Sequence, residues 1–148
     1  MSRGILNYDF FQIEYRTDAL RISGITPTGK SNLLVDLSKM RPISTPHGDF
    51  YFHGGHRLWH APEAMPRTYN PDGNVNVTEV SNGIILDAAT EPGTGIRKRI
   101  EVHLDRDRAS LTLTHTLFNE GMLPVELAPW AITQFRLGGN HDPADAGW

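Results

Sequence analysis

Cysteine is missing from this 148-residue chain, which excludes disulfide bonds and metal sites built from thiolates. A long apolar run is missing as well. The N-terminal segment carries charges at Asp9, Glu14 and Arg16, so it matches neither a signal peptide nor a membrane-spanning helix. We therefore expect a cytoplasmic protein with no membrane partner.

A surplus of positive charge is absent too. The formal net charge is −3, and the 14 Lys and Arg residues are scattered rather than gathered in a stripe, so we expect no nucleic-acid partner. The length suits one packed core and is short for two. We predict a single β-sandwich domain over residues 1–139 and a flexible tail at 140–148, where most residues are small or polar.

Helical periodicity is the last absence, because no stretch keeps apolar residues at i, i+3, i+4 and i+7 for three turns. Short runs rich in β-branched and aromatic residues recur instead, separated by Gly, Pro, Asn and Asp. This pattern predicts an all-β fold, an antiparallel β-sandwich. The expected strands are residues 11–16, 19–25, 32–37, 50–53, 57–61, 75–80, 83–88, 96–105, 110–119 and 124–135.

Two of these strands carry distinct patterns. In residues 96–105 the apolar side chains share one parity, which Lys98 interrupts, and the opposite parity is charged, so one face is expected to be buried. In residues 110–119 leucines share one parity with His115, and threonines share the other with Phe118. Both faces of this strand look covered, which predicts a place inside the sandwich and a buried, hydrogen-bonded His115.

The segment from His47 to Glu63 holds four of the seven histidines, together with an Arg, a Trp and a Gly-Gly step. Imidazole titrates near neutral pH, Trp offers a flat apolar face, and Arg offers a fixed fork of donors. Such a mixture is not a core composition, because a buried strand would hold too many groups that need partners. It favours a site for a polar, ring-shaped ligand.

Strand parity divides this segment. Arg57 and Trp59 share one parity, whereas His56 and His60 share the other. Arg57 is a candidate to bind sugar hydroxyls or a carboxylate, and Trp59 either stacks on a ring or belongs to the core. Glu63 is either a hydroxyl acceptor or merely solvated. The following residues, 62–74, read as a loop between sheets, with Arg67 and Tyr69 as weaker candidates.

A metal site is the alternative interpretation of the same segment, as in cupin-like β-barrels. The candidate ligands are His47, His53, His56, His60 and Glu63. Their spacing argues against it, because cupins place two histidines one residue apart on one strand face, whereas the gaps here are of three and four residues. We therefore expect neither a metal nor another cofactor.

Two runs of sequence carry a family resemblance. One is Phe52-His53-Gly54-Gly55, continued by Trp59 and Pro62, and the other is the segment 111–135 with its Pro-Val-Glu-Leu sequence at 124–127. Together they resemble the galactose mutarotase-like superfamily, which includes aldose 1-epimerases and sugar-phosphate mutarotases. The resemblance implies the N-terminal half of that family's large antiparallel β-sandwich, so a partial domain.

What the resemblance implies for function is sugar recognition. Mutarotation needs an acid and a base on either side of the sugar, and His53 resembles one family histidine. Trp130 stands where the family has its acid histidine, and the family's general-base Glu lies beyond the segments matched here. We therefore expect an aldose 1-epimerase-like protein that binds a sugar or sugar derivative. The expected substrate-binding residues are His56, Arg57, Trp59, Glu63, Trp130 and Arg136.

The alternative is an active sugar mutarotase that is completed by a second half. A partial sandwich also leaves strand edges unpaired, which predicts self-association into a homo-oligomer.

Overall fold

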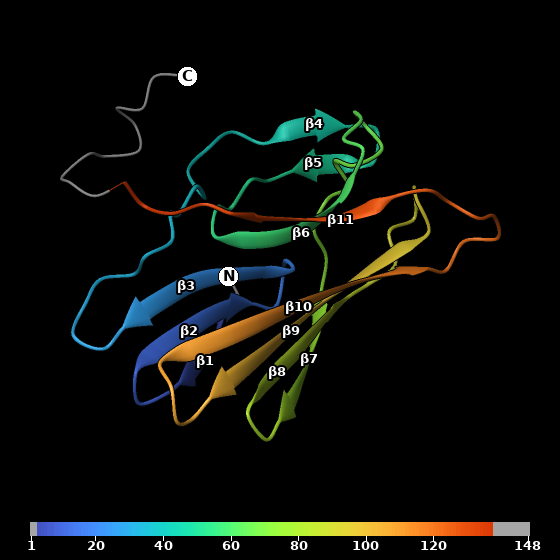
Figure 1. The fold of residues 1–148 in the computed structure, drawn as a ribbon. Coiled ribbons are helices and arrows are strands. Elements are labelled where there is room, and N and C mark those ends of the chain that lie inside the picture. The colour runs from blue at the N-terminus through green and yellow to red at the C-terminus, as the bar shows by residue number, and fades with distance from the viewer. Residues whose placement is uncertain (1–2, 138–148) are drawn as a thin grey trace.

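The computed structural model describes residues 3–137, and in that range it contains strands and no helix (Figure 1). This confirms the all-β prediction; the predicted tail at 140–148 lies outside the described residues. Consequently no helix of this range could cross a membrane. The strands are β1 Arg3–Asn7, β2 Phe11–Arg16, β3 Arg21–Pro27, β4 Ile43–Thr45, β5 Gly48–Phe50, β6 His56–Ala61, β7 Val75–Val80, β8 Gly83–Ala88, β9 Ile96–Asp105, β10 Ser110–Asn119 and β11 Ala128–Thr133.

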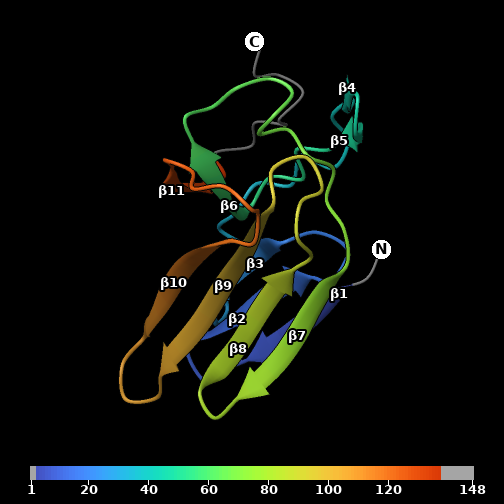
Figure 2. The ribbon, with the colours of Figure 1, turned by 90° about the vertical axis from the view of Figure 1, so that its right-hand side faces the viewer.

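Nine of these strands form two antiparallel sheets that pack face to face, and β4 and β5 form a separate two-stranded sheet (Figure 2). The first sheet has the order β1-β2-β3-β6-β11 and the second β10-β9-β8-β7. Between them lies one hydrophobic cluster that includes Ile13, Ile22 and Leu58 from the first sheet and Leu86 and Ile100 from the second. Burial of each such side chain contributes roughly 1.5–3 kcal/mol, so this cluster holds the sheets together.

Strand β9 shows the predicted alternation, with buried residues at every second position from Ile96 to Leu104. Strand β10 differs from its prediction. It pairs only with β9 and forms an edge of the second sheet, so Thr112 and Thr114 are exposed while Leu111 and Leu113 are half-buried. The prediction of an interior strand was wrong because threonine suits an exposed edge as well as a covered face.

Other strand boundaries moved where pairing depends on distant partners. Residues 32–37 make only isolated bridges, Leu34 with Phe135 and Asp36 with Gly54. The last predicted strand shortens to β11, and the strand predicted at 50–53 shares only Phe50 with β5. Two strands, β1 and β4, were not predicted. Strand β1 has no alternation of its own, and it exists because all five of its residues pair with β2.

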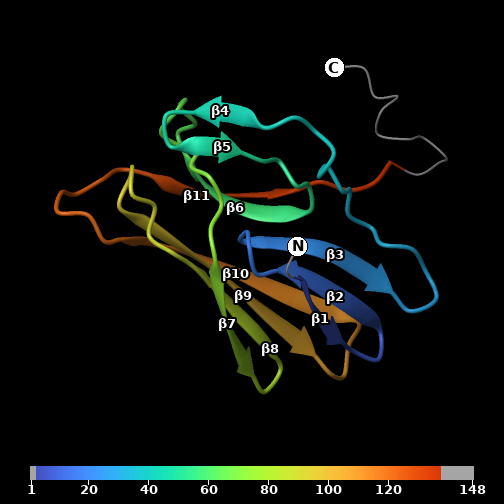
Figure 3. The ribbon, with the colours of Figure 1, turned by 180° about the vertical axis from the view of Figure 1, so that it is seen from behind.

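The short hairpin β4-β5 lies over the outer face of β6 (Figures 1 and 3). Phe50 at its end is buried, with its ring centroid 5.6 Å from that of Trp59. Gly54 and Gly55 then turn the chain into β6 with positive φ angles of 76° and 72°. A Cβ at either position would meet a backbone oxygen at 2.3 Å, so only glycine fits there.

A histidine pair links the two sheets beside β11. The Nε2 atoms of His56 on β6 and His115 on β10 lie 2.8 Å apart, and His56 Nδ1 lies 2.8 Å from Thr133 Oγ1. Burial, together with the nearby His115 and Arg21, lowers the pKa of His56 from 6.5 to about 4. His56 is therefore neutral at pH 7, in keeping with one proton shared between two facing ring nitrogens.

This pKa predicts a pH-dependent stability. Below pH 6.5 the unfolded chain takes up a proton at His56, but the folded chain does so only near pH 4. The contribution of His56 to the free energy of unfolding therefore falls between pH 6.5 and about 4. The loss is on the order of 3 kcal/mol. Urea unfolding at about pH 7 and about pH 5 should show a smaller difference in His56→Gln than in the wild type. The control His103→Gln, at a side chain that is 44% exposed, should keep the wild-type difference. An equal difference between the two pH values in all three proteins would contradict the prediction.

Candidate functional site

Strand β6 divides the histidine-rich segment between two faces, as its parity predicted. His56, Leu58 and His60 point between the sheets, where Leu58 joins the hydrophobic cluster and His60 is completely buried. Arg57 and Trp59 point outward, beneath the β4-β5 hairpin and the 62–74 loop. The predicted site residues therefore do not form one cluster.

The outward face carries an aromatic cluster around Trp59. Strand register places Trp130 of β11 directly opposite Trp59, with ring centroids 5.7 Å apart. Phe50 and Tyr69 complete the cluster, at 5.6 and 5.0 Å from Trp59. Trp59 is 4% exposed and Trp130 36% exposed, so the Trp59 side chain is buried and that of Trp130 is accessible to solvent.

Arg57 is buried against this cluster. Its guanidinium carbon lies 3.8 Å from the Trp59 ring centroid, and Arg21 of β3 is its partner in the strand register. Burial, reinforced by the charge of Arg21, lowers the pKa of Arg57 to about 10, which still leaves it charged at pH 7. Its Nε and Nη1 atoms are buried and have no hydrogen-bond partner.

The other predicted outer residues are held by local contacts. The Tyr69 hydroxyl donates to the Glu63 carboxylate, and this bond raises the pKa of Tyr69. His53 has a φ of 55°, with its Nε2 3.6 Å from an oxygen of Asp72. Burial lowers the pKa of His53 despite that carboxylate, and its Nδ1 is buried without a partner. Arg136 is exposed and donates to the Asn32 carbonyl oxygen at 3.5 Å.

A cavity of about 150 Å³ opens at the end of the sandwich beside Trp59. Its apolar lining includes Phe50, Leu58 and Trp59, and its polar lining includes Arg21, Asn70, Asp72, Glu91 and Lys98. The chain reaches it from β3, β5, β6, the 62–74 loop, the loop at 89–92 and β9. Trp130 does not line this cavity; it contacts Trp59 from the neighbouring strand β11.

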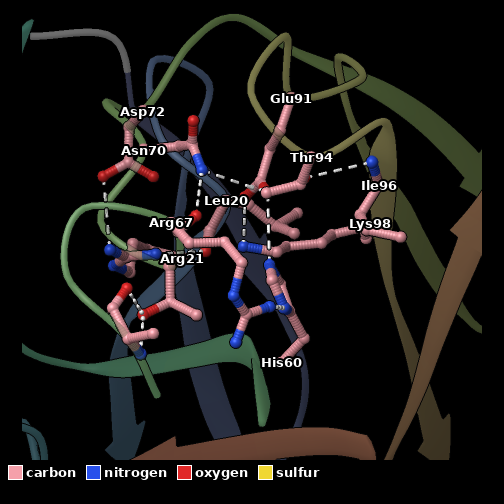
Figure 4. A network of polar contacts seen from close by, with 12 residues as sticks. Leu20, Arg21, His60, Arg67, Asn70, Asp72, Glu91, Thr94, Ile96 and Lys98 are labelled. Carbon is pink, nitrogen blue, oxygen red and sulfur yellow. Dashed lines mark hydrogen bonds and ion pairs between the residues drawn. The ribbon is translucent and has the colours of Figure 1, made fainter. Parts of the chain in front are cut away.

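Glu91 is the centre of the polar network at this cavity (Figure 4). Its carboxylate accepts hydrogen bonds from His60 Nε2 at 3.3 Å, Thr94 Oγ1 at 2.7 Å and Asn70 Nδ2 at 3.4 Å, and it is paired with Lys98 Nζ. Burial by itself would raise the pKa of Glu91, but these donors and the charge of Lys98 lower it to about 2.

The tautomer of His60 follows from its two partners. Arg67 Nη1 lies 3.4 Å from His60 Nδ1, and a guanidinium only donates, so Nδ1 is the acceptor. His60 therefore keeps its proton on Nε2 and donates it to Glu91. This contact joins β6 of the first sheet to the loop that precedes β9 of the second.

Most of the polar residues that line the cavity were not predicted from the sequence. Lys98 carried a signal, because it was the one charged residue on the buried parity of its strand. Such a residue must find a buried countercharge, and Glu91 supplies it from the preceding loop. Arg21, Asn70 and Asp72 carried no comparable signal, since their positions depend on how the loops cross the sandwich end.

The candidate metal ligands of the cupin-like alternative lie on different faces. His56 and His60 face inward, toward His115 and Glu91, whereas His53 and Glu63 lie outside with Asp72 and Tyr69. Over residues 3–137 the structure brings no three His, Asp or Glu side chains into a metal-binding group.

Neither family models, nor curated proteins, nor solved structures gave a match to this chain.

We predict that Glu91 matters for stability. Glu91→Gln should lower the free energy of unfolding by about 3–5 kcal/mol at neutral pH, because Lys98 is left as an unpaired buried charge. Since the folded pKa lies near 2 and the ordinary value is 4.5, the difference from wild type should shrink as the pH falls through that range. Denaturant unfolding measures both. The control Glu79→Gln, at an exposed site on β7, should differ from wild type by less than about 0.5 kcal/mol; an equally mild Glu91→Gln would refute the network's role.

Proposed function

We propose that the protein binds a sugar, or a related hydroxylated ring, in the cavity beside Trp59. The observation that carries this proposal is a pair of unsatisfied polar atoms in residues that line an aromatic-walled cavity. Arg21 Nε is a donor without an acceptor, and Asn70 Oδ1 is an acceptor without a donor. A hydroxyl group both donates and accepts, so a ligand with several hydroxyls satisfies both atoms.

The lining suits the two sides of a sugar ring. Phe50 and Trp59 present aromatic surface, on which the C–H face of a pyranose packs while its hydroxyls reach polar neighbours. The polar neighbours are fixed before any ligand arrives. Arg21 is paired with Asp72 at 3.2 Å, and Lys98 is paired with Glu91. Because these charges are already compensated, the cavity itself favours neutral hydroxyls.

The same electrostatics favour binding over catalysis. A general base works best when its pKa lies near the working pH. Glu91, a carboxylate that lines the cavity, has a pKa of about 2 because His60, Lys98 and Thr94 stabilise its charged form, so it removes protons poorly. His53, the histidine that resembles the family's catalytic residue, does not line the cavity, and its Nε2 lies 3.6 Å from an oxygen of Asp72.

Binding can be tested by isothermal titration with a panel of methyl glycosides of glucose and galactose. We expect saturable binding of at least one of them. Arg21→Lys keeps a positive charge for Asp72 but removes the unpaired Nε donor, so it should weaken binding by about tenfold. The matched control Arg99→Lys alters another arginine in an ion pair, with Asp87 at 2.8 Å on the second sheet, and should bind like wild type. Absence of binding across the panel would disprove the proposal.

Catalysis is tested separately by polarimetry on glucose and galactose. We expect no acceleration of mutarotation over buffer, because Glu91, with a pKa of about 2, is a poor general base. An acceleration that disappears in His53→Ala would contradict this expectation and would favour the mutarotase alternative.

A further inference from the structure

Within residues 3–137, the buried Lys and Arg side chains are paired with carboxylates, with one exception. Arg16 is paired with Asp18 at 2.9 Å, Arg21 with Asp72 at 3.2 Å, and Lys98 with Glu91. Arg57 is 6% exposed, and within residues 3–137 it has no carboxylate at ion-pair distance. A buried charge without a countercharge destabilises a fold by several kcal/mol, so the exception calls for an explanation.

Stacking on the aromatic cluster compensates only part of the cost of burying the Arg57 guanidinium. Its guanidinium carbon lies 3.8 Å from the Trp59 ring centroid and 5.9 Å from that of Phe50. Such contacts involve the flat face of the guanidinium, whereas its N–H groups point outward in the plane. Two of the in-plane nitrogens, Nε and Nη1, are the buried atoms without a partner.

Arg21 adds a third unsatisfied donor next to this pair. It lies directly opposite Arg57 in the β3-β6 register, and directly opposite residues have Cβ atoms about 4.5–5.5 Å apart. Arg21 Nε is buried and unpartnered although its Nη2 is held by Asp72. Carboxylate and phosphate oxygens each accept several hydrogen bonds and match the guanidinium fork.

Arg57 does not line the cavity but lies next to residues that do. Arg21, Phe50 and Trp59 line the cavity, and all three are neighbours of Arg57. The cover over Arg57 is the β4-β5 hairpin, which forms a sheet of its own with two strands (Figure 3). Two-stranded hairpins are marginally stable alone, so this cover rests on Phe50 and can adjust around a ligand.

We propose that the ligand of this protein carries an oxyanion, a carboxylate or a phosphate group, which Arg57 binds next to Arg21 beneath the β4-β5 hairpin. The inference rests on the proposed function, because the ring of the same ligand occupies the cavity. Asp72 does not fill this role, since it is already paired with Arg21. Glu63 is hydrogen-bonded to Tyr69 instead.

The test compares sugars that differ at C6, which carries a neutral hydroxyl group, a carboxylate or a phosphate. Isothermal titration at constant ionic strength should use glucose, glucuronate and glucose 6-phosphate, with acetate and inorganic phosphate alone as further probes. We expect a charged sugar to bind at least about tenfold more tightly than glucose, which corresponds to about 1.4 kcal/mol. An advantage of glucuronate alone identifies a carboxylate, and an advantage of glucose 6-phosphate alone identifies a phosphate.

Two variants show whether Arg57 is responsible for the tighter binding of a charged sugar. Arg57→Gln should bring the charged-to-neutral affinity ratio close to one, and Arg57→Lys, which keeps the charge and loses the fork, should give an intermediate ratio. Arg97→Gln is the control, because Arg97 also stacks on an aromatic ring, that of Phe118 at 3.9 Å, but lies on the second sheet. It should keep the wild-type ratio. Thermal denaturation establishes that each variant is folded, and if Arg57→Gln is not, Arg57→Lys decides.

The outcomes separate this inference from the proposed function. Equal affinities for glucose and both charged sugars would overturn the oxyanion site and leave sugar binding intact. A charge advantage that survives both Arg57 substitutions would overturn it as well, since another cation would then hold the anion. Arg57-dependent binding of acetate or inorganic phosphate, without binding of any sugar, would support the oxyanion site and disprove the sugar cavity.

Discussion

Strand β6 is buried on both faces, and the rest of the molecule is arranged around the polar groups that it carries there. A sheet strand with one wet face can leave alternate residues to water, but β6 has the hydrophobic cluster on one side and the β4-β5 hairpin on the other. Every donor and acceptor of its side chains must therefore find a partner inside the protein. His56 and His60 find theirs across the sheet interface.

The ion pairs at the sandwich end follow from that constraint. Once His60 is buried, its Nε2 donor needs an acceptor, and Glu91 provides it together with the countercharge for Lys98. The loops at 62–74 and 89–92 are then fixed close to each other by Asn70, which donates to Glu91. What remains between these loops and Trp59 is a small cavity whose polar groups are held in place by their own pairing. Such preorganised groups bind a ligand without being ordered by it.

Arg57 is the residue of β6 whose buried donors lack partners among residues 3–137. Its neighbours on β6 have partners, whereas two of its nitrogens have none, and the adjoining Arg21 leaves a third donor unused. Such unsatisfied groups are concentrated at functional sites, where a ligand supplies the hydrogen-bond partners that the protein itself lacks. The proposed oxyanion therefore binds at Arg57 rather than in the cavity, whose own charges are compensated.

The sequence by itself determined the fold class and the four strands of the second sheet, β7 to β10, whose predicted bounds match the structure. Each of these strands pairs with the next one along the chain, so their pairing is local and their alternation is visible in the sequence. It also determined that Arg57 and Trp59 share a face. Only the tertiary structure decided that β10 is an edge and that Arg21, Asp72 and Glu91 meet at one end. Those contacts join residues far apart in sequence, and no periodicity in the chain records which loops will cross.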